Sequence, residues 1–346
     1  MDIPTRCASA SDLPALRAIW DEAFGDEAGF FDFFFEPSLC IVADDAGSPG
    51  AAGYLVPCGD YVAGSQRSAC AMIYGVAASS ASRNRGLGAA VVRGLISAAG
   101  GRGFPSVVLC PSGDSLFEYY SKRSDMRDCF MVRERRFPPG AMEDGHTPLS
   151  RVSPSEYLSI RESVLEGIPH IASTTGILDY QAYLCGSSAS AGSGSSAGSA
   201  ASSGSGSGSG SGASAGLGSS PTDRGGLFTA DTPGGPACLI VELQDDGSVR
   251  INELLAPHGC EHGIVAAVAN TYPSFEYIVR SPVVDAQDLH QARRFGMLAA
   301  MQVRGGDPAP GGSAHSSVPG GGIAGSGVLT PGVSALPAPW YGPALD

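Results

Sequence analysis

The feature that most constrains the fold is a predicted strand that runs through a glycine-rich turn into an amphipathic helix. The apolar run Met72–Ala77 indicates the strand, and the sequence RNRGLG at residues 83–88 indicates the turn. Apolar residues at helical spacing then place one face of a helix against a sheet: Leu87, Val91, Leu95 and Ala99. Such a junction directs the N-terminus of the helix away from the strand end, where a ligand can approach it.

A helix N-terminus of this kind is suited to bind phosphate. Its first N–H groups lack intrahelical partners and carry partial positive charge, and glycines let a polyanion approach the backbone closely. The turn lacks the Gly-Lys-Ser/Thr sequence of a P-loop. It also lacks the third glycine and the later acidic residue of a dinucleotide-binding Rossmann site. An ordinary glycine-rich turn is the alternative interpretation.

The pattern Arg83-x-x-Gly86-x-Gly88 resembles the pyrophosphate-binding motif of the GNAT superfamily of N-acetyltransferases. The strand end Tyr74–Ala77 before it and the short apolar strand 106–110 after the helix are also similar to that family. The resemblance implies an α/β fold with a mixed sheet and acetyl-CoA as acetyl donor. It further implies acetyl transfer to a primary amine of a small molecule or peptide by direct attack. The alternative is a catalytically impaired CoA-binding regulatory or scaffold protein.

The resemblance also implies which residues hold acetyl-CoA. Backbone groups of Val76 and Ala78 are expected to hold the pantetheine arm and the acetyl carbonyl. The side chains of Arg83 and Arg85 are expected to add positive charge near the phosphates. The pyrophosphate is expected to bind backbone N–H groups of the turn and the first helical turn, which belong to Arg85, Gly86, Leu87, Gly88 and Ala89.

A tyrosine in the next helix is the candidate general acid. The family places a tyrosine there to reprotonate the departing CoA thiolate, which indicates Tyr120. The alternative is that Tyr119 and Tyr120 pack in the helix and one of them simply lies near the cofactor. The segment Lys122–Met126 differs from the family's usual Lys-x-Gly-Phe ending by what reads as one added residue, which bears on the exact position of the tyrosine.

Attack by an amine also requires a base that removes the ammonium proton. The strand position where many relatives carry glutamate offers Cys70, Met72 or Tyr74. A water chain or a carboxylate from elsewhere must therefore serve, and the candidates are Glu22, Asp26 and the C-terminal carboxylate of Asp346.

A chain of 346 residues exceeds what one hydrophobic core usually supports, so we expect two domains. Residues 1–138 are expected to form the catalytic domain and residues 141–304 a degenerate GNAT-like domain. The second domain repeats the order of the first, with strands at 237–243 and 249–255, a helix at 262–269, a strand at 275–279 and a helix at Ala286–Phe295. This tandem arrangement resembles the enhanced-intracellular-survival type of acetyltransferase.

The second half lacks the phosphate-binding turn and is therefore not expected to bind CoA. Residues 256–263 contain His258, Cys260, Glu261 and His262, but no second ligand group lies at zinc spacing, so we expect no metal site.

Two segments read as spacers. Residues 186–220 consist almost wholly of Gly, Ser and Ala, which bury too little apolar surface to offset their ordering entropy, so we expect a flexible insertion. Residues 305–346 are expected to form a Gly/Pro-rich tail, in which the apolar run 340–345 could dock as a terminal strand.

Composition limits the partners and the compartment. The net charge of −13 disfavours nucleic acid and anionic membranes, because binding phosphate requires clustered basic residues. The nine cysteines form no CxxC pair, and no run of about 18 apolar residues occurs, so we expect a cytoplasmic protein with reduced thiols. The sequence leaves open whether copies of the chain form a homo-oligomer.

Overall fold

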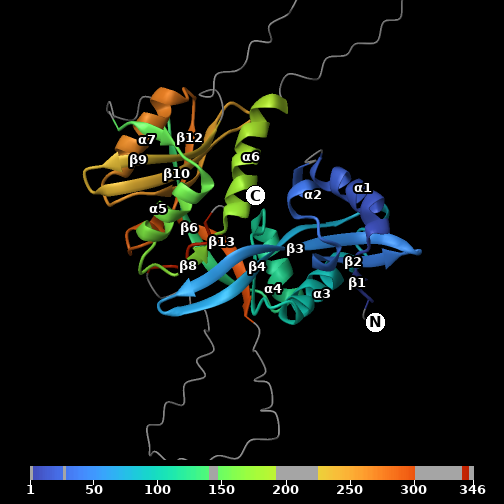
Figure 1. The fold of residues 1–346 in the computed structure, drawn as a ribbon. Coiled ribbons are helices and arrows are strands. Elements are labelled where there is room, and N and C mark those ends of the chain that lie inside the picture. Colours follow the sequence, from blue (N-terminus) through green and yellow to red (C-terminus); the bar gives the residue numbers. More distant parts are fainter. Residues whose placement is uncertain (1–2, 26–28, 140–146, 192–224, 301–336, 343–346) are drawn as a thin grey trace, which may run out of the picture. The chain divides into compact units, whose positions relative to one another are not determined.

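The computed structural model describes residues 3–25, 29–139, 147–191, 225–300 and 337–342. The chain forms two compact units (Figure 1). Unit 1 comprises Met1–Phe130 and Arg294–Ala338, and unit 2 comprises Met131–Arg293 and Pro339–Asp346. No helix of the described residues is long and apolar enough to cross a membrane.

Unit 1 is built on a mixed sheet in the order β1-β2-β3-β4-β5-β13. Neighbouring strands are antiparallel except β4 and β5, which are parallel. The elements are β1 (Arg6–Cys7), α1 (Leu13–Phe24), α2 (Gly29–Phe34), β2 (Cys40–Asp45), β3 (Ser48–Ala63), β4 (Gln66–Ala78), α3 (Leu87–Gly101), β5 (Ser106–Leu109), α4 (Asp114–Arg123) and β13 (Ala292–Ala300).

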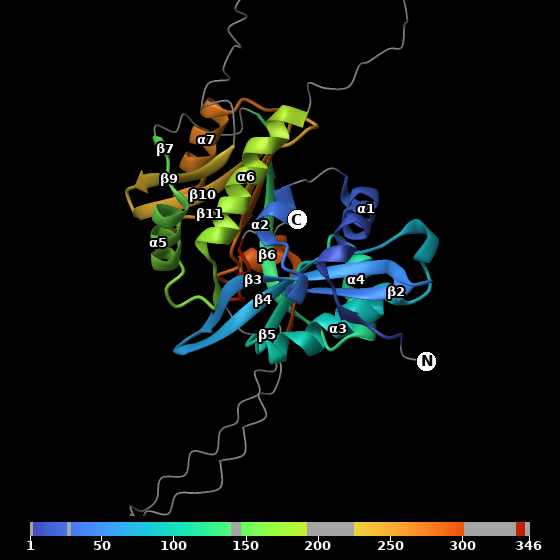
Figure 2. The ribbon, with the colours of Figure 1, turned by 45° about the vertical axis from the view of Figure 1, so that its right-hand side comes forward.

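Helices cover both faces of this sheet. Helices α1 and α2 lie on one face, and α3 and α4 lie on the other (Figures 1 and 2). On the second face, Val91 and Leu95 of α3 pack in one core with Ile73 of β4 and Met297 of β13. The expected amphipathic helix after the turn is therefore present, with its apolar stripe against the sheet.

Five phenylalanines lie at residues 30–35, and four of them belong to the short helix α2. Phe30 and Phe31 are buried against Trp20, whereas Phe33 is 43% exposed. A helix of six residues presents only one side to the sheet, so it cannot bury all five rings.

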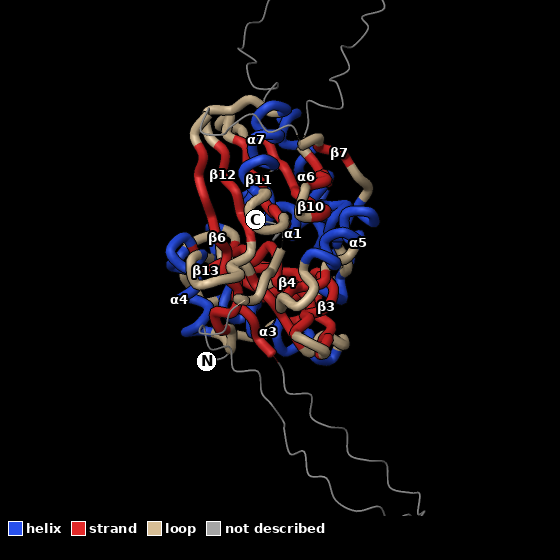
Figure 3. Tube along the Cα trace, turned by 90° about the vertical axis from the view of Figure 1, so that its left-hand side faces the viewer, coloured by secondary structure: helices blue, strands red, loops and turns tan. Residues whose placement is uncertain are grey.

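The strands of unit 2 follow the order β6-β12-β11-β10-β9-β7. Figure 3 shows several of them, including β6, β12, β11 and β10, as strands in red. Strands β11 and β12 are parallel and are joined through α7. The elements are β6 (Arg127–Phe137), β7 (Leu149–Arg151), α5 (Pro154–Val164), β8 (His170–Ala172), α6 (Thr175–Ala191), β9 (Gly226–Thr232), β10 (Gly235–Leu243), β11 (Val249–Leu255), α7 (Glu261–Thr271) and β12 (Tyr277–Ser281).

The strand that follows the unit 1 elements in the sequence, β6, pairs in unit 2, and the strand that follows the unit 2 elements, β13, pairs in unit 1. Residues 133–137 of β6 pair with β12 in unit 2, and residues 297–300 of β13 pair with β5 in unit 1. The helix predicted over Ala286–Phe295 is wrong. A short 3-10 helix, Asp288–Gln291, is followed there by β13. Residues 295–299 are all buried, and residues 297–300 pair with a strand far away in the sequence, so the segment is held as a strand buried on both faces.

The predicted spacers lie mostly outside the described residues. Helix α6 continues to Ala191, and residues 192–224 and 301–336 are not described. Within the expected tail, Trp340 forms a single parallel bridge with His170 and is fully buried in unit 2.

Candidate functional site

Strand β4 carries an irregularity near its end, just before the turn. Tyr54 pairs with Tyr74 and Ala52 pairs with Ala77, so Gly53 of β3 lies opposite both Gly75 and Val76. Gly75 has a φ of +57°, and a Cβ there would overlap the ring of Trp20. The bulge therefore requires glycine, and it changes the direction of the backbone next to Val76.

Strands β4 and β5 part at the same end. Their parallel pairing runs from Cys70 with Ser106 to Met72 with Val108, whereas β4 continues to Ala78. The edge of β4 beyond Met72 is thus the place where an extended chain with amide groups can add to the sheet. This edge includes Val76 and Ala78, which the sequence assigned to the pantetheine arm.

The turn after β4 ends in an open helix N-terminus. Gly86 is the N-cap of α3 with a φ of +84°, and among the described residues no side chain caps it. The first turn of α3 carries no acidic residue, and the first helical bond described runs from the N–H of Ala90 to the carbonyl of Gly86. The N–H groups of Leu87, Gly88 and Ala89 are therefore available to an anion.

The two arginines of the turn are oriented by carboxylates from other elements. Arg83 donates to Glu22 of α1 at 3.1 Å and to the carbonyl of Ala78 at 3.3 Å. Arg85 pairs with Asp45 at the end of β2. Ser82 donates to Asp45 at 2.7 Å, and together with Arg85 it holds the pKa of Asp45 below its ordinary value. These partners were not predicted from the sequence, because they lie on other elements. They hold the loop in place but reduce the free charge of both guanidiniums.

The two tyrosines of α4 have different surroundings. Tyr120 is buried in the core between α3, α4 and the sheet, and this burial, with Tyr119 beside it, raises the pKa of Tyr120 to about 12. Tyr119 is less buried, and its hydroxyl lies 3.7 Å from the position of a Cβ on Gly88. The rings are 5.2 Å apart and nearly perpendicular. Tyr119 is thus the tyrosine that lies next to the open end of α3.

The unusual ending of α4 is accommodated without loss of the core. Ser124 caps the helix, because its N–H and its hydroxyl both donate to the carbonyl of Tyr120, at 2.9 and 2.7 Å. Met126 is fully buried in the same core as Tyr120. The added residue is thus absorbed in the short connection to β6.

Among the candidate bases, Glu22 is the one within the described residues. Its carboxylate accepts from the N–H of Ser80 at 2.7 Å and from Arg83, so it is already engaged by the turn. Asp26 and Asp346 lie outside the described residues.

Residues 8–121 match the family model of the acetyltransferase (GNAT) family. This part of the chain is a GNAT acetyltransferase domain. It contains β4, the turn, α3 and both tyrosines of α4. The GNAT domain makes the chain an acyltransferase, and acetyl-CoA is the donor that this family uses. A comparison with curated proteins finds no match.

Solved structures extend the fold likeness beyond the GNAT domain. A GCN5-related N-acetyltransferase from Anabaena variabilis has a TM-score of 0.59 at 15% identity and covers 87% of this chain and 73% of its own. One from Kribbella flavida has a TM-score of 0.56 at 13% identity, with 85% and 71% covered. Eis1 from Mycobacterium abscessus has a TM-score of 0.52 at 14% identity, with 86% and 73% covered. At these identities the likeness concerns the fold, and it confirms the expected mixed α/β fold. A tandem arrangement like that of Eis fits the length of the chain.

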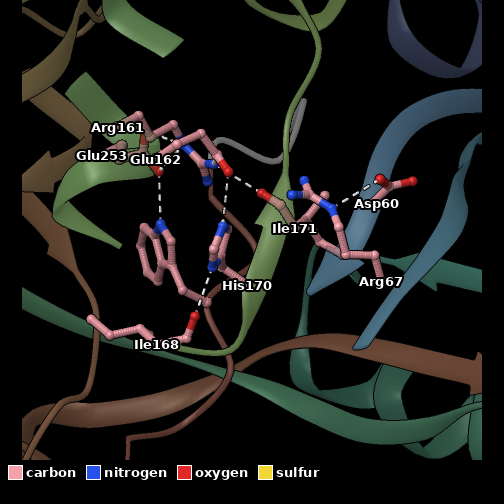
Figure 4. Close-up of polar contacts among 9 residues, drawn as sticks. Asp60, Arg67, Arg161, Glu162, Ile168, His170, Ile171 and Glu253 are labelled. Carbon is pink, nitrogen blue, oxygen red and sulfur yellow. Dashed lines mark hydrogen bonds and ion pairs between the residues drawn. The ribbon is translucent and has the colours of Figure 1, made fainter. Parts of the chain in front are cut away.

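Unit 2 has a corresponding strand end, and it is filled by the chain itself. The bulge of β11 brings Glu253 into a fully buried position, where it accepts from three side chains. Figure 4 shows Glu253 beside one of them, Arg161. These are Tyr157 at 2.7 Å, Arg161 at 3.1 Å and the indole N–H of Trp340 at 2.7 Å. The helix that follows, α7, begins with Glu261, whose carboxylate pairs with Arg133 and Arg135.

Proposed function

We propose that the chain transfers acetyl from acetyl-CoA to a primary amine of a small molecule or peptide by direct attack. The observation that carries this proposal is the junction of β4 and α3. There a bulged strand that has parted from its neighbour leads into a helix whose first N–H groups are free. Such a junction offers an anion site and an amide-binding edge next to each other, as a phosphorylated pantetheine thioester requires.

The proposed donor site uses mainly backbone groups. The N–H groups of residues 85–89 bind the pyrophosphate, and the strand edge at Val76 and Ala78 orients the pantetheine arm and the acetyl carbonyl. Arg83 and Arg85 add charge, because each guanidinium has five N–H donors and only part of them bind Glu22 and Asp45. The turn thus combines a preformed backbone site with two arginines held in fixed positions.

Tyr120 is the proposed general acid. The amine nitrogen attacks the thioester carbonyl, the carbon–sulfur bond breaks, and the thiolate takes a proton from the phenol. Because the pKa of Tyr120 is raised to about 12, the phenol stays protonated at neutral pH and can serve as a proton donor. The ammonium proton of the acceptor leaves through a water chain or through a carboxylate other than the engaged Glu22.

We place this reaction in the cytoplasm. All nine cysteines are free thiols, and burial raises the pKa of several of them, which suits a reducing compartment.

The test is release of CoA thiol in the presence of acetyl-CoA and a panel of polyamines, aminoglycosides and lysine peptides. We expect Tyr120→Phe to lower kcat about 100-fold while the Kd for CoA stays within about twofold. Tyr119→Phe is the matched control and should lower kcat much less. The kcat of the unchanged protein should show no decrease from loss of the Tyr120 proton up to about pH 10, since its pKa lies above that value.

Two outcomes separate the alternatives. Binding of CoA without turnover on any acceptor supports a CoA-binding regulatory protein instead of an enzyme. Equal activity of Tyr120→Phe and the unchanged protein removes Tyr120 from the mechanism.

A further inference from the structure

Residues 340–342, which we call the docked segment, lie in unit 2 in the manner of a bound peptide. Residues 301–336 separate the docked segment from β13. The N–H of Trp340 donates to the carbonyl of Pro169 at 2.7 Å, and the carbonyl of Trp340 accepts from the N–H of Ile171 at 3.0 Å. One residue of the segment thus forms a parallel bridge with β8, which is how a strand recognises an extended peptide.

The pocket that receives the indole is held together by contacts within the rest of unit 2. Glu253 accepts from Tyr157 at 2.7 Å and from Arg161 at 3.1 Å. Arg161 also donates to the carbonyl of Ile171 at 2.9 Å and pairs with Glu162 at 3.0 Å (Figure 4). None of these four contacts involves the docked segment. The pocket therefore has its own internal support and does not require the segment to form.

Two features of the docked segment are specific to it. The indole N–H of Trp340 donates to Glu253 at 2.7 Å, where both groups are fully buried. Gly342 has a φ of +85°, and a Cβ there would overlap the guanidinium of Arg161. A buried aromatic anchor that donates a hydrogen bond, followed two residues later by a glycine in a left-handed conformation, is a pattern by which a pocket can select a short peptide.

One donor of the pocket is open on the side of the docked segment. The Nη2 group of Arg161 lies against Gly342, is buried, and has no hydrogen-bond partner among the residues that the structure describes. A buried donor without a partner is unfavourable, so this group favours a ligand that brings an acceptor next to the glycine. The pocket thus has a donor for a ligand that its own side chains do not use.

We propose that unit 2 carries a binding site for a short peptide of the form Trp-x-Gly, and that the docked segment occupies it as a detachable latch. This inference does not depend on acetyl transfer. A Gly/Pro-rich connection of this length gives an attached ligand an effective concentration on the order of 1 mM. A free peptide with one aromatic anchor is expected to bind with a Kd of about 10 µM. The attached segment therefore fills the site, and a cut in the connection empties it.

The alternative is that the docked segment is an integral strand of unit 2. An integral strand stays in place after the connection is cut, or its loss unfolds the unit. The backbone of the segment forms a single bridge within the described part of the chain, whereas β10 and β11 pair over most of their length. This difference favours a ligand over a strand of the sheet.

The experiment places the recognition sequence of a site-specific protease within residues 310–325 of the full chain and cuts the folded protein. We expect the C-terminal fragment to leave on dilution to about 0.1 µM, and a labelled peptide of residues 337–346 to rebind with a Kd of about 10 µM. The uncut chain should bind this peptide about 100-fold more weakly, because its own segment competes. The matched control is a cut within residues 200–212, after which the fragments should stay together, because α6 packs on β9 and β10.

Changes in the peptide test the recognition without altering the protein. Trp340→Ala should weaken binding of the peptide about 100-fold, because the anchor and its hydrogen bond are both lost. Trp340→Phe should weaken it about tenfold, because only the bond to Glu253 is lost. Gly342→Ala should also weaken it at least about tenfold, because its methyl group meets Arg161. A peptide with the same residues in reverse order should not bind.

Each outcome decides the inference. A fragment that remains on the cut protein after dilution, or a cut protein that unfolds, identifies an integral strand and overturns the latch. Equal binding of the peptide to the cut and the uncut chain overturns it as well, because the peptide then binds elsewhere, and so does failure of the peptide to rebind. If sedimentation shows that the uncut chain forms dimers which the cut abolishes, the segment is exchanged with a second copy and the intramolecular latch is wrong.

Discussion

The two units share a strand-helix-strand arrangement but use it differently. In each, a hairpin strand with one extra residue near its end leads into a helix and then into a parallel strand, as β4-α3-β5 in unit 1 and as β11-α7-β12 in unit 2. In unit 1, α3 begins with Gly86 as N-cap and has no acidic residue in its first turn. In unit 2, α7 begins with Glu261, which pairs with Arg133 and Arg135. The carboxylate that a helix N-terminus favours is thus supplied by the protein in one unit and left for a ligand in the other.

The two bulges also differ in whether protein side chains fill them. The bulge of β4 consists of Gly75 and Val76, which add no polar side chain. The extra residue of β11 is Asn252, whose amide donates to Glu242 at 2.7 Å. The adjacent Glu253 accepts hydrogen bonds from Tyr157, Arg161 and Trp340. The comparison teaches that a few side chains at the bulge and in the first helical turn decide whether this backbone is open to a ligand.

The largest expected effect is at the filled bulge of unit 2. Glu253→Gln removes the buried carboxylate that pairs with Arg161 and leaves it only the partly exposed Glu162, so we expect it to lower the free energy of unfolding by about 4 kcal/mol. The measurement is chemical denaturation followed by tryptophan fluorescence, since Trp340 is one of two tryptophans in the chain and donates to Glu253. Glu162→Gln, at a carboxylate that is 32% exposed, should cost much less. Equal effects from the two variants would mean that the buried pair is not what stabilises unit 2.

The open bulge of unit 1 should be sensitive to size instead of charge. Gly75→Ala forces a side chain into a left-handed backbone and against Trp20, so we expect a loss of about 3 kcal/mol in the free energy of unfolding. Gly101→Ala at the end of α3 has open space around its Cβ and should change stability by less than about 1 kcal/mol. If Gly75→Ala unfolds at the same denaturant concentration as the unchanged protein, the bulge does not require glycine.

Transfer of the unit 2 feature to unit 1 should close the donor site. Gly88→Glu places a carboxylate in the first turn of α3, and we expect CoA to bind about 100-fold more weakly, which corresponds to about 2.7 kcal/mol. Gly88→Gln has the same size without the charge and should weaken binding much less. The Cβ of either side chain finds only the Tyr119 hydroxyl, at 3.7 Å, so both variants should fold. Similar losses from the two variants would show that space, not charge, controls the site.

The sequence predicted local features well, because each depends on neighbouring residues. In α1 (Leu13–Phe24), the apolar residues Leu16, Ile19 and Trp20 recur at helical spacing and are the buried ones. In α5, Ser153 and Glu156 form a capping box, which is a signal carried by residues three positions apart. The turn and helix of the donor site were likewise predicted from Arg83 to Ala99, since their signal lies in glycines and apolar periodicity.

What depends on distant partners was not predicted. Strand β6 is rich in charged residues, and its pairing with β12 lies about 140 positions away in the sequence. The region expected to be a helix at Ala286–Phe295 becomes partly a strand, because pairing with β5 outweighs local propensity. The carboxylates that hold Arg83 and Arg85 come from α1 and β2, which lie far from the turn in the sequence.

The crossing of β6 and β13 between the two sheets has a consequence for biosynthesis. Residues 1–138 contain strands β1 to β5 of unit 1 but lack β13. On its own, this piece therefore leaves the buried strand Ser106–Leu109 as an unprotected apolar edge. The emerging chain must hold that edge without its partner until residue 300 has been synthesised. A shortened gene that stops after the catalytic motifs is therefore expected to produce aggregates, although it encodes every side chain of the donor site.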